Sequence, residues 1–594
     1  MYRAPVDEIS HTLKTVAGLR KALEDGRFGD LGEDLVDAIL TEAGRFASDE
    51  IAPLNEIGDT EGAVLEDGEV TTPKGWRKLY RDWIEGGWNG LTGPEEYGGQ
   101  GLPTLLSVAA LEMWNSGALA FGIGPTLTMG AVEAIEKHAT DELKAKYLEK
   151  LVIGDWMGTM NLTEPQAGSD LNALKTRAEP VGDGTYRIFG QKIYITYGEH
   201  DFTDNIIHLV LARLPDAPAG TRGISLFLVP KFHVGDDGSL GERNDVFCSG
   251  LEHKLGIHAS PTCTMIYGDG KFGDEPGAIG WLIGEENKGL ACMFTMMNNA
   301  RLAVGMQGVA IAETATQKAL AYAKERTQGR APGHTGEDMS PIIEHPDVAR
   351  MLMTMKALTQ GARAICYSCA EALDMARVSE GEEAKAWSER ASLITPIAKA
   401  FSTDIGMEVA SLGVQVHGGM GFIEETGAAR LLRDARIAPI YEGTNGIQAI
   451  DLVMRKLPLS GGETVTKLVA DFRADAEAAR ASNAPEFEGV AKRLDAAIAD
   501  LEGATAYLQK AIAEGRQTDA LSGATPYLRL FGLTATAAML ARGALADMDA
   551  PEAGGRAALA RFAALNLAPE TTGLLAGIVT GASSLEAAKS ALAS

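Results

Sequence analysis

The sequence predicts a mainly α-helical protein with a central β-barrel domain and an extra helical domain at its C-terminal end. Three observations lead to this fold class. Helical periodicity runs to about residue 155, short β-branched runs follow, and helical periodicity returns after about residue 285. A Pro- and Gly-containing linker at 458–462 then precedes a last Ala-rich stretch. We therefore expect four domains, with bounds 1–155, 156–284, 285–457 and 464–594.

The first domain is expected to be helical. Its apolar residues recur at helical spacing, as at Leu35, Ile39 and Phe46. The pattern breaks at 92–101, which is rich in glycine and predicts a loop.

The second domain shows a strand pattern. Its β-branched and aromatic runs are separated by turn residues at 182–184, 190 and 218–220. The runs are Tyr186–Phe189, Lys192–Thr196, Ile206–Leu211 and Ile224–Val229. Short strands at this spacing predict a compact antiparallel β domain.

The remaining chain is expected to form two helical parts. Long periodic segments at 310–326 and 347–378 predict a helical bundle. After the linker, Leu494, Ile498 and Leu501 fall on one face of a predicted helix. No catalytic motif occurs in this last part, which favours a packing or dimerisation module.

The composition narrows the classes of partner. The 594 residues carry a net charge of -27, from 54 basic and 81 acidic side chains, and contain no Lys/Arg-rich block. Nucleic acid and anionic membrane surfaces are therefore unexpected partners. We find neither a signal peptide nor an uninterrupted apolar stretch long enough to cross a bilayer. Five cysteines in so long a chain favour a reducing environment, so we expect a soluble cytoplasmic protein.

A candidate general base lies in the segment Tyr441-Glu442-Gly443-Thr444-Asn445. Glu442 stands between an aromatic residue and a flexible glycine, just after the basic helical pattern at 432–437. A lone carboxylate in a loop is more often solvated than buried. With suitable companions, Glu442 would instead remove a proton from carbon.

Two further segments suggest a bound ligand. The segment 161–170 places hydroxyls and backbone N–H groups on a glycine-containing turn, which suits a ligand rich in oxygen and nitrogen. The alternative is an ordinary turn capped by Ser169 and Asp170. In the second segment, 190–196, Tyr194 and Thr196 are expected on one face of a strand, where they could pack beside a flat heterocycle. The alternative is an ordinary half-buried strand.

Together, these motifs resemble the acyl-CoA dehydrogenase family of flavoproteins over about residues 35 to 457. The matching pieces occur in order at 94–101, 162–165, 167–170, 191–196, 254–256, 415–419 and 441–445. The order of helical, β and helical domains is also that of the family. This resemblance implies FAD as the cofactor, an acyl-CoA substrate, and an enzyme of the oxidoreductase class.

The resemblance also implies roles for individual residues. Glu442 would be the catalytic base, with no metal involved. The cofactor contacts would be Leu162, Thr163, Ser169, Tyr194, Thr196, Arg326, Gln415, Gly418, Gly419 and Thr444. The substrate contacts would be Ser169, Asn298, Arg301 and Gly443. Arg326, Gln415, Gly418 and Gly419 would reach the FAD of a neighbouring subunit, so we expect a homodimer, with a tetramer also open.

Four positions depart from the family pattern. Tyr194 stands where Trp is usual, Gln328 replaces an adenine-side Phe, Gly446 replaces an acid or Gln, and Asn298 replaces an Asp. The same departures occur in a longer subgroup with an extra C-terminal helical domain, which includes 3-methylmercaptopropionyl-CoA dehydrogenases. The resemblance therefore implies oxidation of 3-(methylthio)propanoyl-CoA to 3-(methylthio)acryloyl-CoA, as in dimethylsulfoniopropionate breakdown.

The expected reaction joins two transfers. Glu442 would take the α-proton while a hydride leaves the β-carbon for FAD, and an electron-transferring flavoprotein would then accept the electrons. A general short- or medium-chain acyl-CoA dehydrogenase, an acyl-CoA oxidase, and a non-catalytic or DNA-binding flavoprotein of the same fold are the alternatives. The acidic composition and the retained Glu442 weigh against the last of these.

One further motif favours a structural role. Cys366 and Cys369 form a CxxC pair inside a helical pattern, without the second pair that a zinc site needs.

Overall fold

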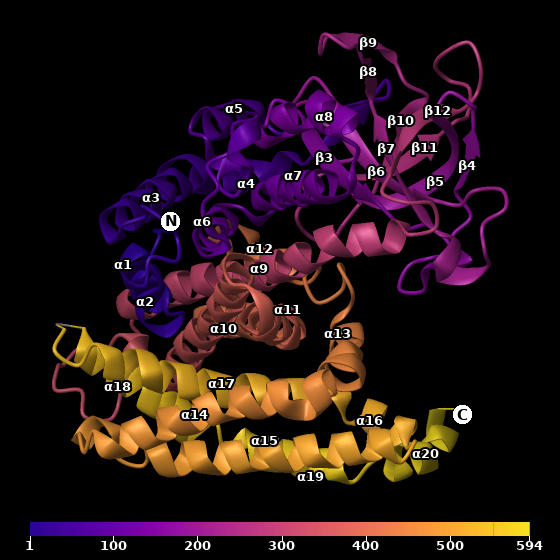
Figure 1. Cartoon of the computed structure of the whole chain (residues 1–594). Coiled ribbons are helices and arrows are strands. Elements are labelled where there is room, and N and C mark those ends of the chain that lie inside the picture. The colour runs from indigo at the N-terminus through magenta and orange to yellow at the C-terminus, as the bar shows by residue number, and fades with distance from the viewer. Residues whose placement is uncertain (551, 593–594) are drawn as a thin grey trace. The chain divides into compact units, whose positions relative to one another are not determined.

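The computed structural model describes residues 1–550 and 552–592, and at Asn298 the backbone alone. The chain forms two compact units, each described here by itself. One unit comprises Phe46–Pro103 and Gly117–Ala300 and contains the large sheet. The other comprises Met1–Arg45, Thr104–Ser116 and Arg301–Ser594 and contains the long helices (Figure 1). The central β region and the helical character of the rest are as the sequence predicts.

The large sheet has eight strands in the order β10-β11-β5-β12-β7-β6-β3, with β4 paired to β5. Their bounds are β3 Met157–Asn161, β4 Arg177–Pro180, β5 Tyr186–Thr196, β6 Ile206–Ala212, β7 Ser225–Pro230, β10 Val246–Leu251, β11 Thr262–Tyr267 and β12 Ala278–Ile283. All pairs are antiparallel except β3 with β6. Within the described residues no pairing joins β10 to β3, so the predicted barrel is an open sheet instead.

Strand β6 shows why this sheet is stable. Alternate residues point to opposite faces of a strand, and both faces of β6 are buried. Ile207, Leu209 and Leu211 join a core with the helices α7 (Leu119–His138) and α8 (Asp141–Ile153). The intervening Val210 and Ala212 join a second core on the other face. Two-sided burial therefore explains why every residue of β6 except His208 is apolar.

Shorter elements complete this unit. They are α4 Asn55–Glu61, β1 Val64–Glu66, β2 Glu69–Thr71, α5 Trp76–Glu85, β8 Phe232–Val234 and β9 Leu240–Arg243. Helix α8 shows ordinary end signals, because Thr140 accepts a hydrogen bond from the Leu143 N–H at its start and Gly154, with a φ of 88°, ends it.

The second unit is helical. Its elements are α1 Val6–His11, α2 Leu19–Glu24, α3 Glu33–Phe46, α6 Thr104–Gly117, α9 Gly289–Glu325, α10 Pro346–Val378, α11 Gly381–His417, α12 Ala428–Ala435, α13 Asn445–Asp451, α14 Glu463–Ala481, α15 Val490–Ala513, α16 Gln517–Ser522, α17 Ala524–Ala546, α18 Ala553–Phe562, α19 Glu570–Val579 and α20 Ser583–Ala588. Helices α3, α6 and α9 each have some residues assigned to the sheet-containing unit.

Helix α17 connects the C-terminal helices to the preceding bundle. It packs against α10, α11 and α13 as well as α14, α15 and α19 (Figure 1). The approach to α11 is close, since a Cβ on Gly532 would overlap the ring of Phe401. Leu494, Ile498 and Leu501 of α15 are fully buried, as the sequence pattern predicts.

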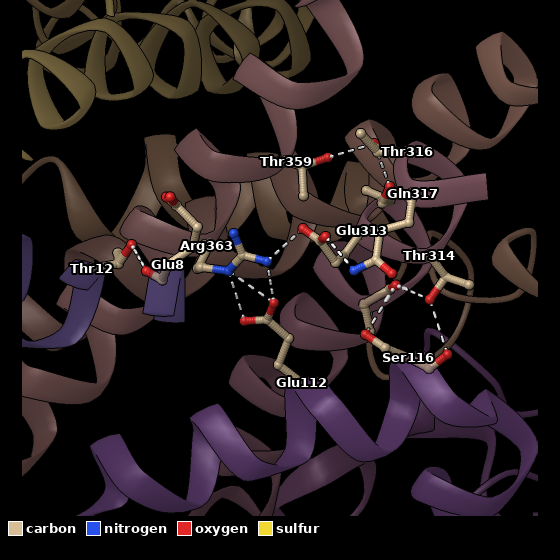
Figure 2. A network of polar contacts seen from close by, with 12 residues as sticks. Glu8, Thr12, Glu112, Ser116, Glu313, Thr314, Thr316, Gln317, Thr359 and Arg363 are labelled. Atoms are coloured by element: carbon tan, nitrogen blue, oxygen red, sulfur yellow. Dashed lines mark hydrogen bonds and ion pairs between the residues drawn. The ribbon is translucent and has the colours of Figure 1, made fainter. Parts of the chain in front are cut away.

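A buried polar network links helices of this unit (Figure 2). The fully buried guanidinium of Arg363 donates to Glu112 through Nε at 2.8 Å and to Glu313 through Nη2 at 2.8 Å. Tyr367 donates its hydroxyl to Glu112 at 2.6 Å, and Gln317 donates to Glu313 at 2.8 Å. One buried guanidinium thus pairs with two carboxylates.

One helical stretch, Ala553–Val579, is apolar and long enough by composition to cross a membrane. No uninterrupted apolar stretch of this length is expected from the sequence. The helical stretch is interrupted, because Arg556, Arg561 and Glu570 lie within it. It contributes to the C-terminal helices through the contacts of α18 and α19 with α17.

Candidate active site

The predicted base lies on a short loop between α12 and α13, in the helical unit. Glu442 has a φ of 53° and Gly443 a φ of 84°, so two successive residues adopt the left-handed region. A glutamate rarely adopts this conformation, which surrounding contacts must hold in place. Its carboxylate is half-buried and accepts no hydrogen bond from the described residues. The solvated loop residue that a lone carboxylate suggests is therefore not what the structure contains.

Several hydrogen bonds hold this loop. The N–H of Asn445 donates to the Pro439 carbonyl at 3.0 Å, and the Thr444 hydroxyl donates to the same oxygen at 3.3 Å. Gln448 donates through Nε2 to the Gly443 carbonyl at 3.3 Å. The predicted contacts Gly443 and Thr444 therefore have roles in shaping the loop itself.

The electrostatic surroundings of Glu442 act in two directions. Burial raises the pKa of Glu442 above its ordinary value, whereas the positive charges of Lys399 and Arg301 pull the pKa down. Arg301 also lies 4.0 Å from Asp451, measured from Nη1 to Oδ2. Burial thus makes the Glu442 carboxylate a better proton acceptor than an exposed glutamate, while the two cations favour its ionised form. The base role of Glu442 stays a prediction.

Two buried amides lie beside this loop. The Tyr441 hydroxyl donates to Oε1 of Gln307, whose Nε2 has no hydrogen-bond partner in the described part of the chain. Oε1 of Gln448 is likewise without a partner there. Unpaired buried polar atoms are costly, and water or a ligand usually satisfies them.

Sequence reasoning missed Lys399, which contacts this loop from α11. Its Nζ donates to the Ala438 carbonyl at 2.9 Å and to Oδ1 of Asn445 at 2.8 Å. A fully buried lysine is unusual, and the sequence around Lys399 carries no motif that could have identified it.

The residues predicted to reach a neighbouring subunit's cofactor are exposed. Gln415 lies in the last turn of α11, and Gly418 and Gly419 follow it with open space around their α-carbons. Arg326 follows α9 and donates to Oε1 of Gln328 at 3.1 Å. These positions leave the four residues available to a ligand.

The other predicted flavin contacts lie in the sheet-containing unit. Thr163 follows β3 and accepts a hydrogen bond at its carbonyl from the Ile193 N–H of β5, at 2.9 Å. The buried Lys192 donates to Glu164 at 2.8 Å and to the Leu162 carbonyl at 3.1 Å. The two motifs that the sequence analysis treated separately are thus joined by a buried ion pair.

The Glu164–Lys192 pair is charged in spite of its burial. Burial opposes ionisation of Glu164, but Lys192 and backbone N–H donors outweigh it and lower the pKa of Glu164 to about 2. Burial lowers the pKa of Lys192 to about 8, against the attraction of Glu164. The pair fixes the turn that leads from β3 to β4.

A β-bulge interrupts β5 at the predicted aromatic. The pairing of β5 with β11 shifts register between Lys192 and Ile195, and Tyr194 has a φ of 60°. Because a bulge adds one residue, Lys192 and Ile195 are both buried although three positions apart. Simple alternation therefore fails between Lys192 and Ile195, whereas Tyr194 and Thr196 stand on either side of the buried Ile195, and Tyr194 is 60% exposed.

The residues present fit an aromatic ligand rich in acceptors. The hydroxyls of Thr163, Ser169 and Thr196 make no hydrogen bond within the described residues, and a Cβ on Gly168 would meet open space. The alternative interpretation of this segment, a capped turn, also finds support, since Asp170 accepts from the Asn172 N–H at 2.9 Å. The available hydroxyls, the exposed Tyr194 ring and the bulge suit a flavin.

The remaining residues that the sequence singles out lie in helices α9 and α10. Asn298 lies within α9, but its side chain is outside the described residues. Cys366 and Cys369 are buried in α10, where they donate to the Ala398 and Ala391 carbonyls. Among the described residues, no group of His, Cys, Asp and Glu could hold a metal ion.

Four family models match the chain in order. They are the N-terminal domain of acyl-CoA dehydrogenase at 34–155, its middle domain at 159–269, its C-terminal domain at 287–457, and a domain described as acetyl-CoA dehydrogenase C-terminal like at 465–589. The last match covers most of the C-terminal extension.

Named proteins are similar over nearly the whole chain. A 3-methylmercaptopropionyl-CoA dehydrogenase of Ruegeria pomeroyi is 47% identical over 92% of this chain and 91% of that protein. A butyryl-CoA dehydrogenase of Syntrophomonas wolfei is 34% identical over 95% of each. The structure of Caenorhabditis elegans ACDH-11 with C11-CoA shares the fold, with a TM-score of 0.77 at 21% identity over 95% of this chain and 91% of that one.

The length of these alignments and the levels of identity show to which family the chain belongs. An identity of 47% over more than nine-tenths of both chains is far above what a shared fold alone produces. The chain belongs to the acyl-CoA dehydrogenase family and is an FAD-dependent oxidoreductase that acts on CH–CH bonds of acyl-CoA.

Proposed function

We propose that the protein oxidises 3-(methylthio)propanoyl-CoA to 3-(methylthio)acryloyl-CoA, as in dimethylsulfoniopropionate breakdown. The observation that carries this substrate is the 47% identity to the Ruegeria pomeroyi relative across 92% of the chain. The shared departures at Tyr194, Gln328 and Gly446 support the same subgroup.

Glu442 is the proposed base. The thioester acidifies the α-carbon, and the half-buried carboxylate of Glu442 accepts the α-proton. When bound, FAD would supply the acceptor for the hydride that leaves the β-carbon. Arg301, Ser169, Asn298 and Gly443 are proposed to bind the acyl-CoA. A carboxylate without a hydrogen-bond donor of its own in the described residues is suited to proton transfer, because no bond must break first.

The proposed FAD contacts comprise side chains and backbone. Thr163 and Thr196 would donate their unused hydroxyls to the ring edge, with the exposed Tyr194 beside the ring. The proposed set is completed by Leu162, Ser169, Arg326, Gln415, Gly418, Gly419 and Thr444. We keep the division into 1–155, 156–284, 285–457 and 464–594 as the proposed domain organisation.

The substrate assignment is tested by anaerobic reduction of the oxidised holoenzyme with a panel of acyl-CoAs. We expect 3-(methylthio)propanoyl-CoA to reduce the flavin with the highest kcat/KM and pentanoyl-CoA to follow within about tenfold. A thioether sulfur and a methylene are close in size, so discrimination between the two is small. If butyryl-CoA or octanoyl-CoA reduces the flavin far faster, the protein is a general short- or medium-chain dehydrogenase instead.

The electron acceptor is proposed to be an electron-transferring flavoprotein in the cytoplasm. All five cysteines are free in the described structure, which supports a reducing compartment. Peroxide release in step with turnover would favour the oxidase alternative. The net charge of -27 gives no support to a DNA-binding flavoprotein.

We propose a homodimer in which the segment 418–423 meets a second copy. Met420, Phe422 and Ile423 are 50%, 85% and 45% exposed, beside the glycines predicted to reach the partner's FAD. Grouped exposed apolar side chains commonly mark an interaction surface.

Phe422→Ser is expected to weaken both dimerisation and FAD retention, because the apolar contact and the shared cofactor contact lie in one segment. Sedimentation equilibrium and the ratio of flavin to protein measure the two effects. Leu592→Ser is the matched control, since Leu592 is 86% exposed and lies at the other end of this unit's sequence. A Phe422→Ser protein that stays dimeric and fully flavinylated would refute the interface.

A further inference from the structure

A buried lysine also joins the two arms of the Glu442 loop, beside the backbone hydrogen bond from Asn445 to Pro439. Lys399 lies in α11 and is fully buried. Its Nζ donates to the Ala438 carbonyl at 2.9 Å and to Oδ1 of Asn445 at 2.8 Å. One acceptor precedes Glu442 and the other follows it, so one ammonium group joins the two arms of the loop.

The second acceptor is held in a fixed orientation. Nδ2 of Asn445 donates to the Ala400 carbonyl at 3.1 Å, to Oγ1 of Thr403 at 2.9 Å and to Oδ1 of Asp404 at 2.8 Å. These partners are acceptors, so a rotated amide would place its oxygen against a carbonyl and a carboxylate, and its NH₂ against the ammonium. The amide oxygen of Asn445 must therefore face Lys399.

The charges around Glu442 come from several elements. Lys399 and Asp404 lie on α11, Arg301 lies on α9, and Asp451 of α13 pairs with Arg301 at 4.0 Å and with Arg455 at 2.7 Å. Asp451 thus offsets part of the positive charge of Arg301. Lys399 contacts a neutral amide at Asn445, and its positive charge acts on Glu442 and on Asp404.

We propose that Lys399 is a positioning residue of the reaction, which holds the Glu442 loop closed and keeps a positive charge beside the carboxylate. This role rests on the proposed function of Glu442 as the base. It explains how a glutamate stays in a left-handed backbone conformation and ionises in a partly buried place.

The pH dependence of the reaction distinguishes this role from a merely structural one. A base acts when deprotonated, and a nearby positive charge favours the deprotonated carboxylate. Loss of that charge in Lys399→Met should therefore move the acidic limb of kcat/KM upward by about 1 pH unit. Burial lowers the pKa of Lys399 to about 8, so the lysine loses its positive charge above that pH. The wild-type kcat/KM should therefore also fall on an alkaline limb near pH 8. This second limb should be absent in Lys399→Met and in Lys399→Arg.

The experiment uses the full-length holoenzyme and anaerobic flavin reduction by 3-(methylthio)propanoyl-CoA and by butyryl-CoA across pH. Lys385→Met is the matched control, because Lys385 is an exposed lysine of the same helix. Its profile should equal that of the wild type. Asn445→Ala removes one acceptor but retains the lysine charge, so it should move the acidic limb less than Lys399→Met.

A second readout does not depend on turnover. Amide hydrogen exchange in peptides that span 438–447 should be faster in Lys399→Met and Asn445→Ala than in the wild type and Lys385→Met. If no acyl-CoA reduces the wild-type flavin, the proposed function fails, and hydrogen exchange alone decides whether Lys399 holds the loop. An unchanged acidic limb in active Lys399→Met overturns the charge role, and unchanged exchange overturns the holding role.

Discussion

Replacing Glu442 by Gln is expected to lower the rate of flavin reduction by acyl-CoA by about a hundred- to ten-thousand-fold. The amide has nearly the shape of the carboxylate, so the loop and bound FAD should be retained. It cannot accept the α-proton, however, so the chemical step is lost. Stopped-flow mixing under anaerobic conditions measures the rate, and the flavin spectrum of the variant shows whether the cofactor is bound.

Two variants control this experiment. Glu424→Gln changes an exposed carboxylate on a neighbouring segment and should leave the rate unchanged. Glu442→Asp retains a carboxylate but places it one methylene farther from the substrate. Its rate of flavin reduction should therefore lie between those of wild type and Glu442→Gln. Full activity in Glu442→Gln would show that Glu442 is not the catalytic base.

The second large effect is expected in the buried network of Figure 2. Arg363 is fully buried, and Arg363→Met would leave the carboxylates of Glu112 and Glu313 without their positive partner. Removing one member of a buried ion pair typically costs about 3–5 kcal/mol. Urea denaturation should show the free energy of unfolding of the helical unit reduced by about this amount.

An exposed ion pair gives the comparison. Arg350 lies 2.8 Å from Asp347 on the surface of α10, and both side chains are more than half exposed. Arg350→Met should change the free energy of unfolding by less than about 1 kcal/mol. Equal losses in the two variants would show that burial does not govern the contribution of Arg363.

The sequence predicted the elements of the site better than it predicted their surroundings. Glu442, Thr163 and Thr196 could be proposed as site residues because short motifs carry them, and their roles stay predictions. Lys399 was missed because a lysine in a long apolar helix gives no motif, and only the three-dimensional course of the loop brings it to Ala438 and Asn445. The bulge at Tyr194 was missed because it depends on the register with β11, which is set by pairing between distant strands.

The fold shows the same division between local and non-local information. Helices such as α10 and α15 follow from periodicity along the chain. The open edge of the sheet does not, because strand order depends on contacts between distant segments. The β1–β2 hairpin could have been predicted, since Asp67 and Gly68, both with positive φ, form a typical hairpin turn between two short strands.

The central claim is that this chain dehydrogenates an acyl-CoA with Glu442 as the base. Its most direct test mixes oxidised wild type and Glu442→Gln with 3-(methylthio)propanoyl-CoA under anaerobic conditions and follows flavin bleaching and product mass. The account predicts that wild type bleaches and forms the unsaturated product, whereas Glu442→Gln, with FAD still bound, does neither at a comparable rate. Equal bleaching in both proteins, or none by any acyl-CoA in the wild type, would contradict it.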